Sequence, residues 1–174
     1  FNEYFVNVNT LNKKTGISPM SDNRLAIVAD KHEIETLQRL YAKATDLIGH
    51  GTQETFEQGR EIYRRIYTGD VDIRTANTGD DPFVAKGPDA WADVCRGALK
   101  DYTGTQHLIG TQLTEVDGDE AQMESYLNAW HKNRDLTVYY FLGTYISKTR
   151  RTPQGWKIFD MTLRLDTNGT VQTT

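Results

Sequence analysis

Apolar residues recur at helical spacing in three segments of the first hundred residues. The first segment predicts a helix over residues 30–49, opened by a capping-box pattern of Asp30 and Glu33. Further helices are expected over residues 54–67 and 87–99. The apolar face of the first helix carries Ile34, Leu37, Tyr41, Ala44 and Ile48.

The later part of the chain consists of long strand-like runs instead. A short run over 71–75 precedes the third helix, and four longer runs cover 106–116, 122–131, 136–148 and 156–165. Turn-forming residues separate the four longer runs at 117–119, 132–134 and 153–155. Helices followed by an antiparallel meander predict an α+β fold in which three N-terminal helices pack on one face of a curved antiparallel sheet.

One of these strands has no polar face. Val138 to Leu142 is apolar or aromatic at both parities, so both sides of the sheet need a cover at this point. The helices can cover one side. A second copy of the protein is the simplest cover for the other, so we expect a homodimer or homotrimer.

Composition limits the classes of function. The chain of 174 residues with 37% hydrophobic content fits one domain over residues 21–174, preceded by an N-terminal arm or a non-native extension over residues 1–20. A net charge of −4 argues against nucleic-acid binding, and no apolar run is long enough to span a membrane. Cys95 is the single cysteine, which excludes an intrachain disulfide and a cysteine-based zinc site. We expect a soluble, cytoplasmic protein.

Three short motifs together resemble the SnoaL-like superfamily of NTF2-like, cystatin-like cones. They are Tyr41 followed five residues later by Asp46, a mid-chain His107 on a strand, and the closing sequence Arg-Thr-x-x-Gly-Trp-x-Ile over 151–158. The resemblance covers residues 30–167 and implies a cone-shaped α+β barrel. Relatives include scytalone dehydratase, bile acid 7α-dehydratase, ketosteroid isomerase, cofactorless lyases of lignin-derived diarylpropanes, and small subunits of ring-hydroxylating dioxygenases.

The resemblance also implies a set of catalytic residues. In dehydratase-like members a tyrosine, an aspartate and a histidine meet inside the cone, and Tyr41, Asp46 and His107 stand at those positions. His131 stands where scytalone dehydratase has a second histidine. No metal and no organic cofactor is implied.

The chemistry of these side chains fits acid/base catalysis. His107 suits the base, Asp46 would fix its tautomer, and Tyr41 would polarise the leaving oxygen. The alternative for His107 is a core histidine bonded to a backbone carbonyl. The alternative for Asp46 is a solvated aspartate, because the five positions that separate it from Tyr41 along a helix correspond to a rotation of about 140°. A three-residue hairpin turn would place His131 on the same face as His107, whereas a two-residue turn would place it on the opposite face.

The expected function is a cofactor-independent lyase, either a dehydratase or a deformylating retro-aldol enzyme. Its substrate would be a small hydroxylated aromatic compound, including lignin-derived ones, or a polyketide-like compound. One alternative is a non-catalytic dioxygenase small subunit or ligand-binding module, and another is an isomerase of the ketosteroid-isomerase type with Asp46 as base. The candidate substrate-binding residues are Tyr67, Arg74, Trp91, Asn128 and Tyr140.

Overall fold

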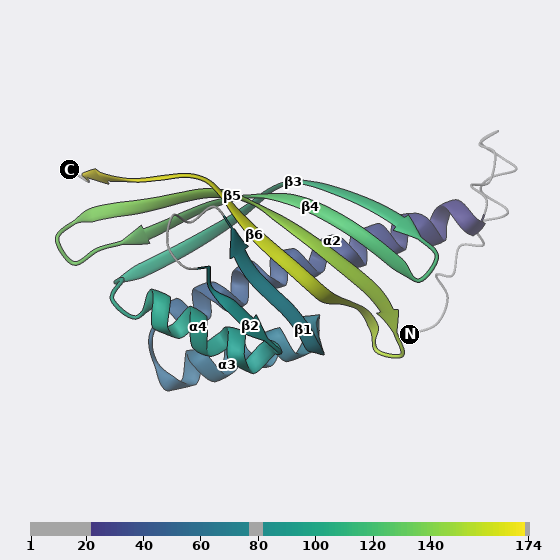
Figure 1. The fold of residues 1–174 in the computed structure, drawn as a ribbon, viewed down its shortest axis with the longest axis horizontal. Coiled ribbons are helices and arrows are strands. Elements are labelled where there is room, and N and C mark those ends of the chain that lie inside the picture. The colour runs from purple at the N-terminus through teal and green to yellow at the C-terminus, as the bar shows by residue number, and fades with distance from the viewer. Residues whose placement is uncertain (1–21, 77–81, 173–174) are drawn as a thin grey trace, which may run out of the picture.

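The computed structural model describes residues 22–76 and 82–172 (Figure 1). The expected N-terminal arm therefore lies outside the described residues. The helices are α2 (Asp22–Gly49), α3 (Gln53–Ile66) and α4 (Pro88–Leu99). The strands are β1 (Tyr67–Ala76), β2 (Val84–Lys86), β3 (Gly104–Asp117), β4 (Glu120–Lys132), β5 (Thr137–Thr152) and β6 (Gly155–Gln172).

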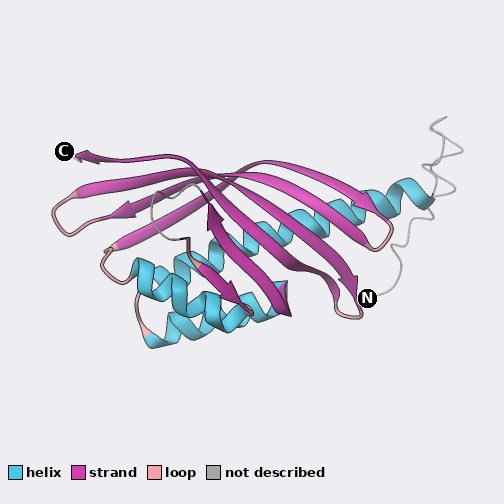
Figure 2. Ribbon diagram, viewed as in Figure 1, coloured by secondary structure: helices cyan, strands magenta, loops and turns pink. Residues whose placement is uncertain are grey.

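The strands form one curved sheet in the order β2-β1-β6-β5-β4-β3, and the three helices lie against one of its faces (Figure 2). This confirms the predicted cone-like α+β fold, with a sheet that stays open between its edge strands β2 and β3. The pairing of β1 with β6 is parallel, so the sheet is mixed rather than wholly antiparallel. The additional strand β2 is only three residues long and pairs with β1.

Helix α2 is longer than predicted, and its predicted start at residue 30 was wrong. The helix already includes Asp22, and Asp30 and Glu33 lie inside it. Their carboxylates bind the last strand instead: Asp30 accepts from the Trp156 indole Nε1 at 3.0 Å, and Glu33 accepts from the Trp156 backbone N at 2.8 Å. Asp30 also pairs with Arg151 at 2.8 Å. The capping-box pattern thus attaches α2 to the β5–β6 turn.

The interior of the cone contains four tyrosines from four elements. Tyr41 stacks on Tyr63 with ring centroids 5.5 Å apart and meets the edges of Tyr67 and Tyr145. All four are buried. Because aromatic rings bury large areas and prefer stacked or edge-to-face contacts, this cluster is the centre of the core between the helices and the sheet.

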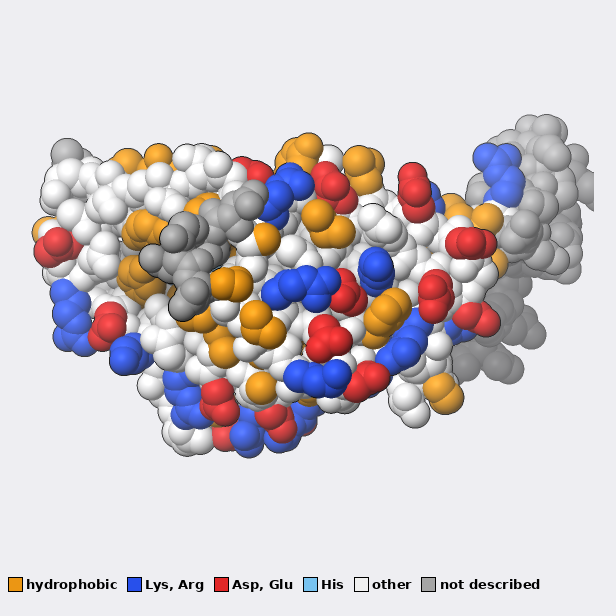
Figure 3. All heavy atoms as spheres, viewed as in Figure 1, with side chains coloured by type: hydrophobic (Ala, Val, Ile, Leu, Met, Phe, Trp, Pro, Cys, Tyr) orange, Lys and Arg blue, Asp and Glu red, His pale blue; other side chains and the backbone are white. Residues whose placement is uncertain are grey.

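The outer surface differs between the two sides of the sheet. Figure 3 shows positive and negative side chains interspersed on one face of the molecule, with hydrophobic side chains between them. Phe83, just before β2, is 51% exposed. On the face of the sheet away from the helices, Leu108, Tyr126 and Trp130 are exposed, and Trp130 lies beside Tyr140 with ring centroids 6.0 Å apart. No helix within residues 22–76 and 82–172 is long and apolar enough to cross a membrane.

Candidate active site

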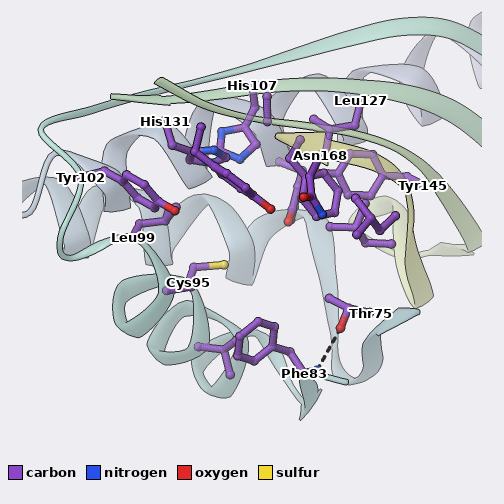
Figure 4. Close-up of a pocket in the computed structure, with 18 of the residues that line it drawn as sticks. Thr75, Phe83, Cys95, Leu99, Tyr102, His107, Leu127, His131, Tyr145 and Asn168 are labelled. Carbon is purple, nitrogen blue, oxygen red and sulfur yellow. Dashed lines mark hydrogen bonds between the residues drawn. The ribbon is translucent and has the colours of Figure 1, made fainter. Parts of the chain in front are cut away.

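A cavity of about 350 Å³ opens between the helices and the sheet. Its wall is largely apolar, with a small number of polar side chains (Figure 4). Such a combination is typical of small-molecule sites. The lining residues are Tyr41, Thr75, Phe83, Trp91, Val94, Cys95, Ala98, Leu99, Tyr102, His107, Leu127, Ala129, His131, Tyr139, Phe141, Tyr145, Leu163, Leu165 and Asn168.

His107 on β3 projects into this cavity and is held from behind by Asp46 on α2. The His107 Nδ1 and the Asp46 Oδ1 are 2.7 Å apart, and the His107 side chain is 7% exposed. The Asp46 carboxylate also accepts from the backbone N of His107 at 3.3 Å and from the Thr105 hydroxyl at 3.2 Å. Three hydrogen bonds orient the carboxylate, and the pairing leaves His107 Nε2 for a ligand.

Tyr41 and Asp46 point in different directions from α2, because five positions along a helix rotate about 140°. Tyr41 points into the tyrosine cluster and lines the cavity, whereas Asp46 points sideways to β3, which packs along the helix. Tyr41 therefore lines the site directly, whereas Asp46 contributes to it through its hydrogen bond with His107. The angle between the two side chains on α2, which argued against a shared role, lets Asp46 bind His107 on β3 while Tyr41 lines the cavity.

His107 and His131 share one face of the sheet because of a β-bulge in β3. The turn between β3 and β4 is of the two-residue type, since Asp117 pairs with Glu120, and this alone would put His107 and His131 on opposite faces. The register then shifts around Thr111, so that His107 pairs with Ala129 and Thr105 pairs with His131. One extra residue in β3 reverses the parity. The two imidazole rings consequently lie on one face with centroids 5.3 Å apart.

The environment of His131 keeps its imidazole neutral. Burial lowers the pKa of His131 to about 4, and the neighbouring His107 adds to this effect. The rings of Tyr102 and Tyr139 lie 4.9 and 5.9 Å from its own. Its buried Nδ1 has no hydrogen-bond partner among the described residues. A neutral imidazole at this place can donate a hydrogen bond to a bound polar group or accept one from it.

Two further polar groups of the cavity keep their protons. Burial raises the pKa of the Tyr41 hydroxyl, so this group donates a hydrogen bond without ionising. Burial also raises the pKa of the Cys95 thiol to about 12. A thiol that stays protonated at neutral pH is a poor nucleophile, which leaves the imidazoles as the groups suited to proton transfer.

Of the five expected substrate-binding residues, Trp91 alone is among those that line the cavity. Tyr67 lies in the core with its hydroxyl on the Met161 sulfur. Arg74 lies on the outer face of β1, paired with Asp160 at 3.0 Å. This removes the reason for assigning Tyr67 and Arg74 to substrate binding at this cavity.

Asn128 and Tyr140 have the wrong parity for the cavity. Their strand neighbours Ala129 and Tyr139 line it, so Asn128 and Tyr140 lie on the opposite face of the sheet. Both assignments are corrected by this alternation. Tyr140 instead extends the aromatic surface around Trp130.

Tyr102, Tyr139 and Asn168 are among the cavity residues that were not anticipated from the sequence. Tyr102 lies beside His131, and Asn168 on β6 also lines the cavity (Figure 4). Tyr139 pairs with His131 across β4 and β5, so the register of that strand pair would have identified it. Asn168 lies beyond residue 165, where the predicted last strand ends, and no sequence pattern pointed to it.

An open α+β cone with a histidine–carboxylate pair at an apolar cavity defines the class of this protein. A family model of the SnoaL-like domain matches residues 26–162, and the chain belongs to that family. Comparison with curated protein sequences gave no match.

Solved structures show the same fold at low sequence identity. An NTF2-like protein with a cystatin-like fold from Novosphingobium aromaticivorans aligns with a TM-score of 0.66 at 21% identity, covering 85% of this chain and 92% of its own. A candidate scytalone dehydratase from the same species gives 0.65 at 21%, covering 89% and 94%. The hexachlorocyclohexane dehydrochlorinase LinA-type3 from Novosphingobium barchaimii gives 0.65 at 14%, covering 87% and 96%.

Proposed function

We propose that the protein is a cofactor-independent lyase that acts on a small hydroxylated aromatic or polyketide-like compound. The observation that carries this proposal is the His107–Asp46 pair, 2.7 Å apart, at the wall of a largely apolar cavity. A carboxylate bonded to an imidazole fixes its tautomer and stabilises the protonated ring, which is what a general base needs. Similarity in fold to a candidate dehydratase and a dehydrochlorinase agrees with elimination chemistry.

The elimination of water can be written with this chain's own groups. His107 Nε2 takes a proton from a carbon of the substrate, and the electron pair of that C–H bond forms the new double bond as the C–O bond breaks. The departing hydroxyl receives the proton from the imidazolium and leaves as water. Tyr41 donates a hydrogen bond to a substrate oxygen, and the neutral His131 hydrogen-bonds the polar end of the substrate.

Loss of formaldehyde from a hydroxymethyl side chain is the second form of the same proposal. In that retro-aldol step His107 takes the hydroxyl proton, the C=O bond of formaldehyde forms as the C–C bond breaks, and the carbon left with the electron pair takes the proton back from the imidazolium, so the same base serves both reactions. The products distinguish them, since one reaction releases water and the other releases formaldehyde.

Two alternatives are less well supported. An isomerase with Asp46 as base would need that carboxylate free in the cavity, yet it binds His107 and Thr105. A non-catalytic dioxygenase small subunit would need neither the pair nor a cavity. Co-purification with a larger iron-containing subunit would favour that alternative over the lyase.

The test is a panel of hydroxylated aromatic and polyketide-like compounds assayed for loss of water or formaldehyde by mass spectrometry. With the substrate so found, His107→Ala should lower turnover by at least about a hundredfold, the lower end for removing a general base. His50→Ala, at the exposed end of α2, is the matched control and should keep full activity. Near-normal turnover of His107→Ala would reject the proposed role of the base.

A further inference from the structure

On the face of the sheet away from the helices, the side chains of β4 form a nearly symmetric series. Every second residue of this strand points outward, and the outward residues are Glu124, Tyr126, Asn128, Trp130 and Lys132. Asn128 is the middle of the series, with an aromatic ring two positions away on either side. The two ends, four positions away, carry charges of opposite sign. We call these five residues the β4 series.

The neighbouring strands continue this symmetry. Asn128 pairs with Leu108 of β3 on one side and with Leu142 of β5 on the other, so an apolar row crosses the sheet at this point. Four positions from Leu142 in either direction, β5 carries the half-buried Val138 and Ile146, which pair with the two ends of the β4 series. The outer face therefore has similar side chains on both sides of the row through Asn128.

Asn128 also has an unused hydrogen-bonding atom. Its side-chain Oδ1 is buried and has no hydrogen-bond partner among the described residues. A buried acceptor without a donor costs free energy, so a donor from outside these residues is expected at this place. A second Asn128 can supply it, because a carboxamide carries both an acceptor oxygen and an NH2 donor.

We propose that this face of the sheet binds a second copy of the chain about a twofold axis that passes over Asn128, between the two sheets and at a right angle to β4. The two β4 strands then run antiparallel, with Asn128 against the partner's Asn128 and Trp130 against the partner's Tyr126. Each Lys132 lies near the partner's Glu124. The pattern therefore supports the dimer among the two assemblies expected from the sequence.

The opposite charges at the two ends of the β4 series favour a second copy as the occupant. A twofold rotation exchanges the ends, so a lysine meets a glutamate twice in each dimer, whereas ends of equal charge would repel each other. A threefold assembly joins two different patches at each interface and does not require this symmetry. The twist of packed sheets turns the facing strands by about 30°, an offset that the long side chains of Glu124 and Lys132 can span.

The test reverses the charge at each end of the β4 series. Glu124→Lys makes both ends positive, and Lys132→Glu makes both ends negative. The dimer dissociation constant is measured by analytical ultracentrifugation at low ionic strength. The wild type should be a dimer, and each variant should dimerise at least about tenfold more weakly, because two attractive pairs become repulsive. An equimolar mixture of the two variants should form a heterodimer, since every pair between unlike copies again joins opposite charges.

Glu61→Lys is the matched control, because it changes the net charge equally at an exposed position of α3, on the side of the helices. It should leave the dissociation constant unchanged. Glu124 and Lys132 are themselves exposed, so both reversals should keep the fold, which circular dichroism and the melting temperature check.

The possible results decide for or against this interface. A monomeric or trimeric wild type overturns it, and so does a dimer whose dissociation constant neither reversal changes. Two monomeric variants that fail to associate when mixed overturn the pairing of the two ends. Recovery in the mixture supports the twofold axis through Asn128, because only the pairing of unlike ends predicts it. The β4 series lies outside the cavity, so this result does not depend on the lyase activity.

Discussion

Replacing Asp46 with asparagine removes the negative charge behind His107 while keeping the size of the side chain. The asparagine oxygen can still accept from Thr105 or from the backbone N of His107, so the fold of this region should persist. Its NH2 group can instead donate to His107 Nδ1. That would move the ring proton to Nε2, the nitrogen that must accept a proton from the substrate.

The size of the effect follows from the 2.7 Å bond between Asp46 and His107. A hydrogen bond to a charged group contributes about 1.5–3 kcal/mol. Since about 1.4 kcal/mol corresponds to a tenfold change in rate, losing this bond should lower kcat/KM by about tenfold to 150-fold. The tautomer change adds to this loss, so tenfold is the lower limit.

Two measurements check this prediction. Steady-state kinetics gives kcat/KM, and 15N NMR of the imidazole ring shows which nitrogen of His107 carries the proton. We expect the proton on Nδ1 in the wild type and on Nε2 in Asp46→Asn. Asp93→Asn, in an exposed ion pair on α4, serves as control. Wild-type kinetics in Asp46→Asn, with an unchanged tautomer, would refute the view that Asp46 orients the base.

The remaining predictions concern stability and assembly. Folded His131 binds its proton only near pH 4, whereas an unfolded histidine does so near 6.5, so the unfolded state binds more protons between these values. The free energy of unfolding should therefore fall by about 2–3 kcal/mol from this group between pH 7 and pH 4.5, measured by urea unfolding. An equal fall in His131→Gln would contradict it. The homodimer or homotrimer stays a prediction: Trp130→Lys on the outer face should yield a monomer in light scattering, and a monomeric wild type would reject it.

Periodicity predicted the elements well where packing follows the local pattern. The spans predicted for α3 and α4 agree with the structure to within a residue or so at each end, because their apolar stripes, turn residues and first-turn proline all agree. The start of α2 was wrong because Asp30 and Glu33 have the composition of a cap but bind Trp156, 123 or more positions later. A local pattern cannot distinguish these two uses of a carboxylate.

The sequence predicted which types of residue form the site, but not on which face of the sheet each strand residue lies. Tyr41 and His107 line the cavity as expected. Asn128 and Tyr140 were assigned to substrate binding although each lies one position from a cavity residue, Ala129 and Tyr139. Because strand side chains alternate, a register error of one residue exchanges the two faces of the sheet.

The register depends in turn on a single residue of β3. Without the shift at Thr111, His131 would pair with Gln106, so His107 would lie on the opposite face of the sheet from His131, and no sequence pattern marks this bulge. The same strand also receives Asp46, through a close approach of α2 that Gly49 permits, since a Cβ there would collide with the Thr105 hydroxyl. That hydroxyl donates to Asp46. A bulge and a missing side chain, both outside the cavity, thus determine that two imidazoles and a carboxylate meet at one place.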